Sequence, residues 1–129
     1  MKIILKIFSL LFVFLILIQN KSEFAYGIGN VDWLLLKENN DGKEWIDMGS
    51  IKSINDKEIS VLTKFLQNPK NSNDKEKLSL YVMRINCTEN KFKDTSINGI
   101  PQFNSKWQNT NNDELIDVVI KKGCSAVID

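Results

Sequence analysis

Residues 78–87 read LSLYVMRINC, and this stretch decides the fold class of the chain. Its apolar side chains alternate, and a β-strand directs successive side chains to opposite faces of a sheet. One face is expected to carry Tyr81, Met83, Ile85 and Cys87. The other face is expected to carry Leu80, Val82 and Arg84. The stretch therefore predicts a long strand within a sheet.

Further strands are predicted on both sides of this one, at residues 31–37, 43–48, 51–54, 58–67, 91–97 and 100–103. The first of them is apolar on both faces in its middle, which predicts a central strand. Asp41-Gly42 and Asn98-Gly99 are hairpin signals, so the neighbouring strands are expected to run antiparallel. Pro101 has no backbone N–H to donate, which confines its strand to an edge or a bulge.

The segment 68–77 is polar throughout and has no periodicity, so we expect a solvated, mobile loop there.

The end of the chain changes period. Leu115, Ile116, Val119 and Ile120 form one apolar stripe at helical spacing. Asn112 is predicted to cap this helix, and Gly123 to end it in the left-handed conformation. An antiparallel sheet followed by one amphipathic helix gives an α+β fold.

Composition excludes several kinds of chemistry. The chain has 129 residues, which suits a single domain, and it contains no histidine. A Ser-His-Asp triad, a Cys-His pair and nearly every zinc or copper site are therefore excluded. Residues 28–129 carry 14 basic and 15 acidic side chains. A charge balance so close to neutral does not favour nucleic-acid binding.

The first 27 residues are predicted to be a secretory signal peptide. Lys2 and Lys6 precede the apolar run at residues 7–18, and Ala25-Tyr26-Gly27 offers small residues before a cleavage site. The run is shorter than the roughly 20 apolar residues that span a bilayer, which argues against an uncleaved anchor. Residues 28–129 are therefore expected to form an exported domain, periplasmic or at the cell surface.

The two cysteines, Cys87 and Cys124, are expected to form a disulfide. Cysteines of exported chains usually pair, and two cysteines can pair in only one way. The bridge would pin the helix against the sheet face that bears Met83 and Ile85. Chain-entropy arithmetic gives it about 4 kcal/mol of stabilisation. A redox pair and a metal site are less favoured because the Cys-x-x-Cys spacing and histidine are both missing.

These features also follow one another in a familiar order. The order is Trp33 at the start of a strand, Trp45-Ile46-Asp47 with Ser50-Ile51 after its turn, Cys87, Asn98-Gly99, Trp107 and Cys124. Over residues 31–125 the chain resembles the surface-adhesin protein E-like domain of bacterial exported proteins. The resemblance implies a six-stranded antiparallel sheet whose concave face holds a disulfide-tethered C-terminal helix. It also implies adhesion to host proteins.

A search for catalytic or metal-binding residues identifies no complete site. Residues 39–42 fail as an EF-hand loop, because Lys37 and Met48 would occupy its first and twelfth positions. Glu44 and Asp47 lie three apart on a strand and so face opposite ways. Asp47 is expected to bond the backbone of the following turn. Asn86-Cys87-Thr88 formally matches a glycosylation sequon. Because its cysteine is expected to be in a disulfide, we give this match little weight. No catalytic residue, cofactor or metal is assigned.

Tryptophans and lysines are the candidates for a binding surface. Trp33, Trp45 and Trp107 could line such a surface, but their spacing on strands favours core packing. A loosely basic stretch contains Lys57, Lys64, Lys70, Lys75 and Lys77. Acidic residues are interleaved with these lysines, which favours a solvated face over a patch for acidic partners.

The sequence favours a non-catalytic exported binding module of the bacterial cell envelope. It would use the exposed sheet face, an edge strand or the 68–77 loop to bind a protein or peptide in the envelope or outside the cell. The first alternative is an envelope enzyme or inhibitor with a carboxylate-based site, such as Asp32 and Asp47 on neighbouring strands. The second is a structural protein anchored in the membrane by an uncleaved N-terminal segment.

Overall fold

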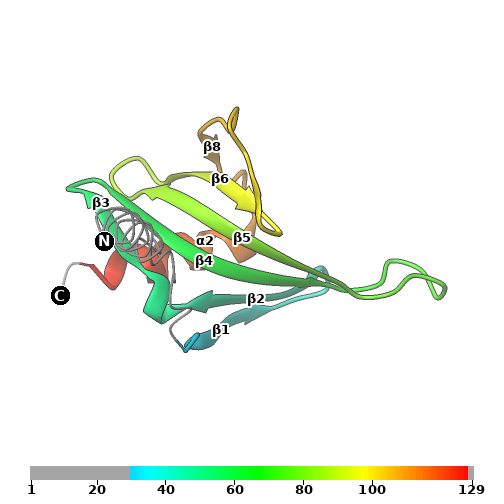
Figure 1. The fold of residues 1–129 in the computed structure, drawn as a ribbon. Coiled ribbons are helices and arrows are strands. Elements are labelled where there is room, and N and C mark those ends of the chain that lie inside the picture. The colour runs from blue at the N-terminus through cyan, green and yellow to red at the C-terminus, as the bar shows by residue number, and fades with distance from the viewer. Residues whose placement is uncertain (1–29, 128–129) are drawn as a thin grey trace, which may run out of the picture.

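The computed structural model describes residues 30–127, so the predicted signal peptide at residues 1–27 lies outside the described residues. Figure 1 shows a curved sheet with a helix behind it. The strands are β1 (Trp33–Glu38), β2 (Gly42–Asp47), β3 (Lys52–Asn55), β4 (Glu58–Gln67), β5 (Lys77–Asn86), β6 (Lys91–Ile97), β7 (Ile100–Pro101) and β8 (Gln108–Asn109). A 3-10 turn, η1 (Met48–Ser50), separates β2 from β3, and the helix is α2 (Glu114–Ser125).

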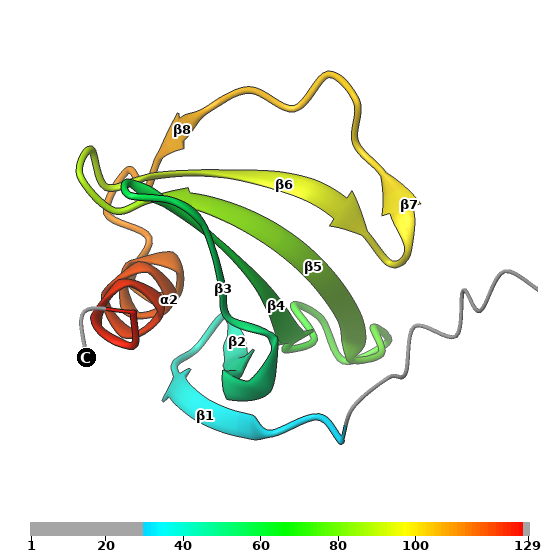
Figure 2. The ribbon, with the colours of Figure 1, turned by 60° about the vertical axis from the view of Figure 1, so that its left-hand side comes forward.

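All strand pairs in the sheet are antiparallel. The main path runs β1-β2-β4-β5-β6-β7, while β3 pairs with β4 and β8 pairs with β6. The α2 helix lies against the concave face, and the segment from β7 to β8 arches out beyond β6 (Figure 2). The predicted α+β fold, with about six antiparallel strands and one tethered C-terminal helix, is confirmed.

The core lies between the concave face and α2. Its buried members are Ile46, Ile59, Val61, Met83, Ile85, Val119 and Ile120. The predicted face of β5 is correct, since Met83 and Ile85 are buried while Leu80 is exposed. We call the helix-covered face the inner face and the opposite one the outer face.

One strand prediction is wrong in position. The apolar segment predicted at residues 31–37 forms β1, which lies at the edge of the sheet; within the described residues it pairs with β2 alone. Leu34 and Leu35 are 40% and 47% exposed. The strand is apolar on both faces for another reason. Its inner side is contacted by α2, and its other side belongs to the outer face of the sheet, which is also apolar.

Both predicted hairpin turns form. Asn98 and Gly99 have φ values of 50° and 81°, the positive values that a type I′ turn requires. Gly42 is needed for a different reason: a Cβ there would lie 2.1 Å from the carbonyl oxygen of Leu66. Only glycine therefore lets β2 approach β4 at this point.

The helix is correct in position but both predicted ends are wrong. Asp113, and not Asn112, is the N-cap; its carboxylate accepts hydrogen bonds from the N–H groups of Leu115 and Ile116. Asn112 has a φ of 67° and belongs to the turn before the cap. Gly123 lies inside the helix, which continues to Ser125. A Cβ on Gly123 would lie 2.9 Å from Cδ1 of Ile59, so this glycine permits close packing of helix on sheet.

The chain between β6 and α2 is the least regular part of the described domain. Pro101 lies in the edge strand β7, as its missing N–H predicts. The predicted strand at 100–103 is only two residues long, and β8 was not predicted.

Candidate functional site

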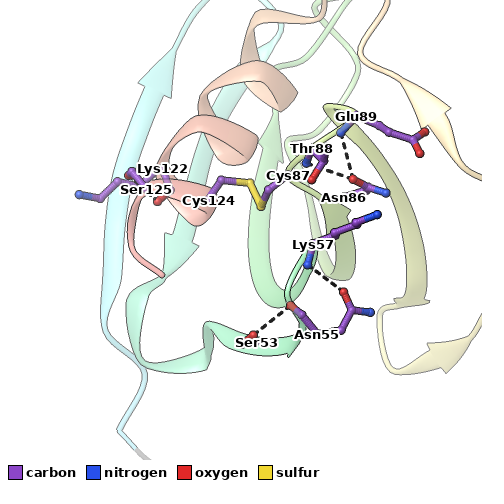
Figure 3. The surroundings of a disulfide bond; sticks show 10 residues. All are labelled: Ser53, Asn55, Lys57, Asn86, Cys87, Thr88, Glu89, Lys122, Cys124 and Ser125. Carbon is purple, nitrogen blue, oxygen red and sulfur yellow. Dashed lines mark hydrogen bonds between the residues drawn. A yellow bond between two sulfur atoms is a disulfide. The ribbon is translucent and has the colours of Figure 1, made fainter. Parts of the chain in front are cut away.

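The disulfide joins the end of β5 to the last turn of α2. The Cα atoms of Cys87 and Cys124 are 5.7 Å apart, within the usual range for a bridge. Figure 3 shows the bridge crossing from helix to sheet. The N–H of Cys87 donates to the carbonyl of Lys57 at 2.8 Å, which also ties this point to the β3–β4 turn. The bridge thus holds the helix over the inner face, as predicted.

The same region contains the formal glycosylation sequon. The side-chain oxygen of Asn86 accepts hydrogen bonds from the N–H groups of Thr88 and Glu89 (Figure 3). The amide therefore organises the β5–β6 turn.

The tryptophans do not enter the core, so the predicted core packing is wrong. Trp33 and Trp45 are half-buried on the outer face, and the ammonium of Lys64 lies 4.5 Å from the centroid of each ring. Trp107 is 37% exposed, with the ammonium of Lys93 4.8 Å from its ring centroid. Each of the three rings therefore contacts a lysine, in the geometry of a cation–π interaction.

Apolar side chains surround the Lys64 ammonium. Strand register pairs Leu35 with Trp45, Trp45 with Lys64 and Lys64 with Leu80, which places all four on one face. The next pair is Leu66 with Leu78. We define the outer patch as Trp33, Leu35, Trp45, Lys64, Leu66, Leu78 and Leu80. Three of its leucines remain exposed, at 47% for Leu35, 55% for Leu78 and 38% for Leu80.

The predicted loop at 68–77 is the tip of the long β4–β5 hairpin. In Figure 1 this hairpin projects well beyond the rest of the sheet. Its base is tied down, because the Asn68 side chain donates to the carbonyls of Asn39 and Asn40 at 3.3 and 3.2 Å. Residues 69–76 are exposed.

The basic stretch does not form one patch. Lys57 lies before β4, whereas Lys70, Lys75 and Lys77 lie beyond its other end. Ten residues of extended strand separate these positions by about 33 Å. Lys64 lies midway along β4, and its ammonium contacts the rings of Trp33 and Trp45. The preference for a solvated face over an acidic-partner patch agrees with this placement.

Asp47 is a structural residue. Its Oδ1 accepts hydrogen bonds from the N–H of Asp32 at 2.8 Å and of Gly49 at 3.1 Å. The hydroxyl of Ser50 donates to the Asp47 carbonyl and accepts from the N–H of Leu62. The predicted bond from Asp47 to the following turn is confirmed. Asp32 contacts the Asp47 carboxylate through its backbone N–H, so the hydrogen bonds of this carboxylate hold the backbone in place.

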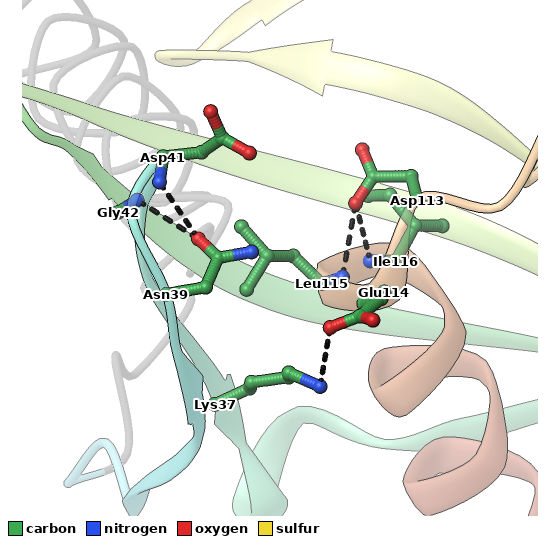
Figure 4. A network of polar contacts seen from close by, with 8 residues as sticks. All are labelled: Lys37, Asn39, Asp41, Gly42, Asp113, Glu114, Leu115 and Ile116. Atoms are coloured by element: carbon green, nitrogen blue, oxygen red, sulfur yellow. Dashed lines mark hydrogen bonds and ion pairs between the residues drawn. The ribbon is translucent and has the colours of Figure 1, made fainter.

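Residues 39–42 form the predicted hairpin turn. The side-chain oxygen of Asn39 accepts hydrogen bonds from the N–H groups of Asp41 and Gly42 at 2.9 and 3.2 Å (Figure 4). Within residues 30–127, no group of three or more acidic or cysteine side chains is placed to hold a metal ion.

A cavity on the inner face was missed by the sequence analysis. It has a volume of about 290 Å³ and lies between the sheet and the start of α2. Its sheet side is lined by Glu44, Thr63, Phe65, Tyr81, Phe92 and Asp94, and its helix side by Asp113, Leu115 and Ile116. We call this space the inner cavity. An open polar depression of about 780 Å³ shares Phe92, Gln108, Asp113 and Ile116 with it and forms its mouth.

Glu44 is the unusual residue of the inner cavity. Its side chain is only 3% exposed, and burial raises its pKa to about 8, opposed by a hydrogen bond from Thr63 and reinforced by Asp113 and Asp94. Burial also raises the pKa of Asp94. The signal for Glu44 was present in the sequence, since alternation along β2 places it on the same face as Ile46.

The basic residue nearest in register does not neutralise Glu44. Lys37 is the partner of Glu44 across β1 and β2, yet its ammonium pairs with Glu114 at 2.6 Å (Figure 4). The inner cavity therefore holds buried acidity beside aromatic walls. Such an arrangement can bind a cation or hold a proton.

The described residues contain no helix that is both long and apolar enough to cross a membrane. No curated protein and no solved structure shows a significant match to the chain. The model of the surface adhesin-E family matches residues 34–129, which is most of the chain. The matched span includes every strand from β2 onward, both cysteines, and the lining of the inner cavity. On that match, the chain belongs to the surface adhesin-E family.

Proposed function

We propose that the protein is an exported, non-catalytic binding module that recognises a protein or peptide outside the cytoplasm through its outer patch. The observation that carries this proposal is the patch itself, in which two tryptophans and three exposed leucines surround one lysine. Exposed aromatic and apolar side chains gathered on one face are typical of interaction sites. Membership of a surface adhesin family supports the same function.

The contacts within the outer patch favour recognition of a partner. Trp33, Trp45 and Lys64 are carried by three adjacent strands, and each tryptophan ring contacts the same ammonium. A partner would therefore meet side chains that are already ordered, which lowers the entropic cost of binding.

Export is the second part of the proposal. A cleaved signal peptide at residues 1–27 would deliver residues 28–129 to the periplasm or the cell surface, where a disulfide persists. Intact mass of the protein from its own cells tests this, measured with and without reduction after thiol blocking. A chain that starts near Ile28 and has no free thiols supports export. A full-length chain in the membrane fraction would instead favour the anchored structural protein.

Partner capture tests the role of the outer patch. The oxidised protein is immobilised and exposed to envelope extract and to extracellular host proteins. A Leu35→Ser/Leu80→Ser variant changes the patch, and a Lys70→Ser/Lys75→Ser variant changes the hairpin tip as a matched control. We expect the first variant to lose the retained partner and the second to keep it. Retention of the same proteins by both variants would refute the assignment to this face.

A second candidate function is an envelope enzyme or inhibitor with a carboxylate-based site. Glu44 and Asp94 line one cavity, and the raised pKa of Glu44 is typical of a general acid. Hydrolase substrates of the envelope distinguish the two functions: turnover by the wild type that Glu44→Gln abolishes would favour the enzyme.

A further inference from the structure

The inner cavity has the size of a single side chain. Its volume of about 290 Å³ is at the lower end for ligand pockets, which span about 300–1,000 Å³. The volume is still well above the roughly 150 Å³ of a cavity that holds benzene. A ligand group here would therefore be a short chain or a small amine.

The carboxyl group of Glu44 lines this cavity without a cationic partner. Glu44 as a residue is only 3% exposed. Among residues 30–127, the ion pairs nearest in sequence join Lys37 to Glu114 and Lys43 to Glu38, and neither involves Glu44. Its hydrogen-bond partner is the neutral side chain of Thr63, so within residues 30–127 the buried carboxyl group has no counter-ion.

The basic group across from Glu44, Lys37 on β1, is paired with Glu114, and the charges that act on Glu44 are acidic. Asp113, before α2, and Asp94, on β6, both act on it as negative charges. The carboxylate of Asp113 is itself engaged by the N–H groups of Leu115 and Ile116. Tyr81, on β5, adds a phenol to the cavity lining. The electrostatic character of the cavity thus favours a positive guest over a negative one.

The remaining walls suit the rest of such a guest. Phe65, Tyr81 and Phe92 contribute aromatic rings, and Met83, Leu115 and Ile116 contribute apolar surface. Aromatic rings attract cations, and apolar surface covers a methylene stem. The mouth adds the polar side chains of Asn109, Asn111 and Asn112.

We propose that the inner cavity binds an organic cation, an alkylammonium group on a short apolar stem, with Glu44 as its counter-ion. This site lies on the face opposite the outer patch, so it stands independently of the proposed partner recognition. The alkylammonium group belongs either to a free amine or to a lysine side chain of another protein. The chemistry of the site is the same for both.

Binding is expected to release a proton. In the empty cavity Glu44 is protonated at neutral pH, because its pKa is about 8. An entering ammonium ion stabilises the carboxylate, and the Glu44 proton leaves to solvent while the ligand keeps its own charge. Affinity should therefore rise with pH up to about 8.

Calorimetric titration of the oxidised, intact protein tests this site. The probes are n-butylammonium, the neutral control n-butanol, Nα-acetyl-lysine methylamide and a short lysine-containing peptide. We expect n-butylammonium to bind with release of about one proton near neutral pH, measured in buffers of different ionisation enthalpy. n-Butanol should bind about thirtyfold more weakly or worse.

Variants locate the effect. Glu44→Gln replaces a neutral acid by an amide of the same shape and should lose about thirtyfold in affinity together with the proton release. Glu76→Gln, in the exposed hairpin tip, should bind as the wild type does. Binding of the peptide alone would identify a protein side chain as the guest, and binding of the free amine alone a small molecule.

Three results would overturn the proposal. They are equal affinity for n-butylammonium and n-butanol, wild-type binding without proton release, and a Glu44→Gln variant that binds like the wild type. The first two use only the wild type, so they stand even if the variant does not fold. Loss of partner capture by the outer patch would leave this site unaffected.

Discussion

The two faces of the sheet are built from the same strands and have opposite chemistry. The inner face is covered by α2 and has an aliphatic centre, with Ile46, Val61 and Ile85 each no more than 1% exposed. The outer face is aromatic and open, with Trp33 and Trp45 around Lys64. Because alternate residues of one strand supply both faces, the buried inner residues are expected to determine most of the stability, and the outer ones are available for the recognition proposed above. Four measurements test this division.

The largest effect is expected from a core truncation on the inner face. Ile46→Ala removes a side chain with no exposed surface and should cost about 2–5 kcal/mol of unfolding free energy. Leu35→Ala, on the outer face of the neighbouring strand, should cost about 0.5 kcal/mol or less. Urea unfolding measures both. Equal losses at the two positions would contradict the division between the faces.

The covalent tie of the inner face should come next. Cys87→Ser/Cys124→Ser removes the bridge between β5 and α2 and should lower the unfolding free energy by about 2–4 kcal/mol. The wild type with and without reductant gives the same comparison without mutation. A reduced protein as stable as the oxidised one would show that packing alone holds the helix.

The acid on the inner face gives stability a pH dependence. Folding raises the pKa of Glu44 from 4.5 to about 8, so the folded state binds the extra proton between these values. Stability is then fully present below the unfolded pKa and falls as pH rises towards about 8, by at most about 1.4 kcal/mol per pH unit.

Glu44→Gln tests this directly. The variant should lose most of the slope, and its stability relative to the wild type should increase as pH rises from 4.5 to about 8, because it has no carboxyl group to ionise. Unfolding free energies measured across this range provide the comparison. If the substitution left the slope of stability against pH unchanged, the pH dependence would come from another group, and Asp94 would be the first to test.

The smallest effect is expected on the outer face. Lys64→Met keeps the methylene stem but loses the charge between the two tryptophans, at a cost of about 1 kcal/mol. Lys93→Met, which affects the single ring of Trp107, should cost about half of that. Urea unfolding with tryptophan fluorescence follows both variants. A Lys64 effect no larger than that of Lys93 would argue against the double contact.

Local patterns in the sequence predicted most of the fold. Alternation along residues 78–87 gave the correct buried face, and the predicted bounds of β4 and β6 are correct because both segments lie between clear turn signals. Residues 31–37 were misplaced as a central strand, since alternation does not say how many neighbours a strand has. Gly123 was misread because a glycine near a helix end also permits close packing.

The candidate sites were harder to predict. The tryptophans were assigned to the core, since hydrophobicity favours burial and a lysine thirty-one residues from Trp33 gives no sequence signal of contact. Alternation along the strand separates Glu44 from Asp47, but the burial of Glu44 depends on α2, which follows about seventy residues later. Both errors involve contacts between distant segments, which a pattern of near neighbours does not contain.

The disulfide has a further consequence if the domain is pulled from its ends, as surface attachment under flow would do. Unfolding would normally release the 37 residue steps between Cys87 and Cys124 as slack chain. With the bridge intact, the Cα atoms of the two cysteines stay 5.7 Å apart. The chain between them therefore cannot extend, which shortens the unfolded length by about 120 Å. The pulling force then bypasses the segment between the cysteines, which contains β6, β7, β8 and most of α2. The force acts on the strands from β1 to β5.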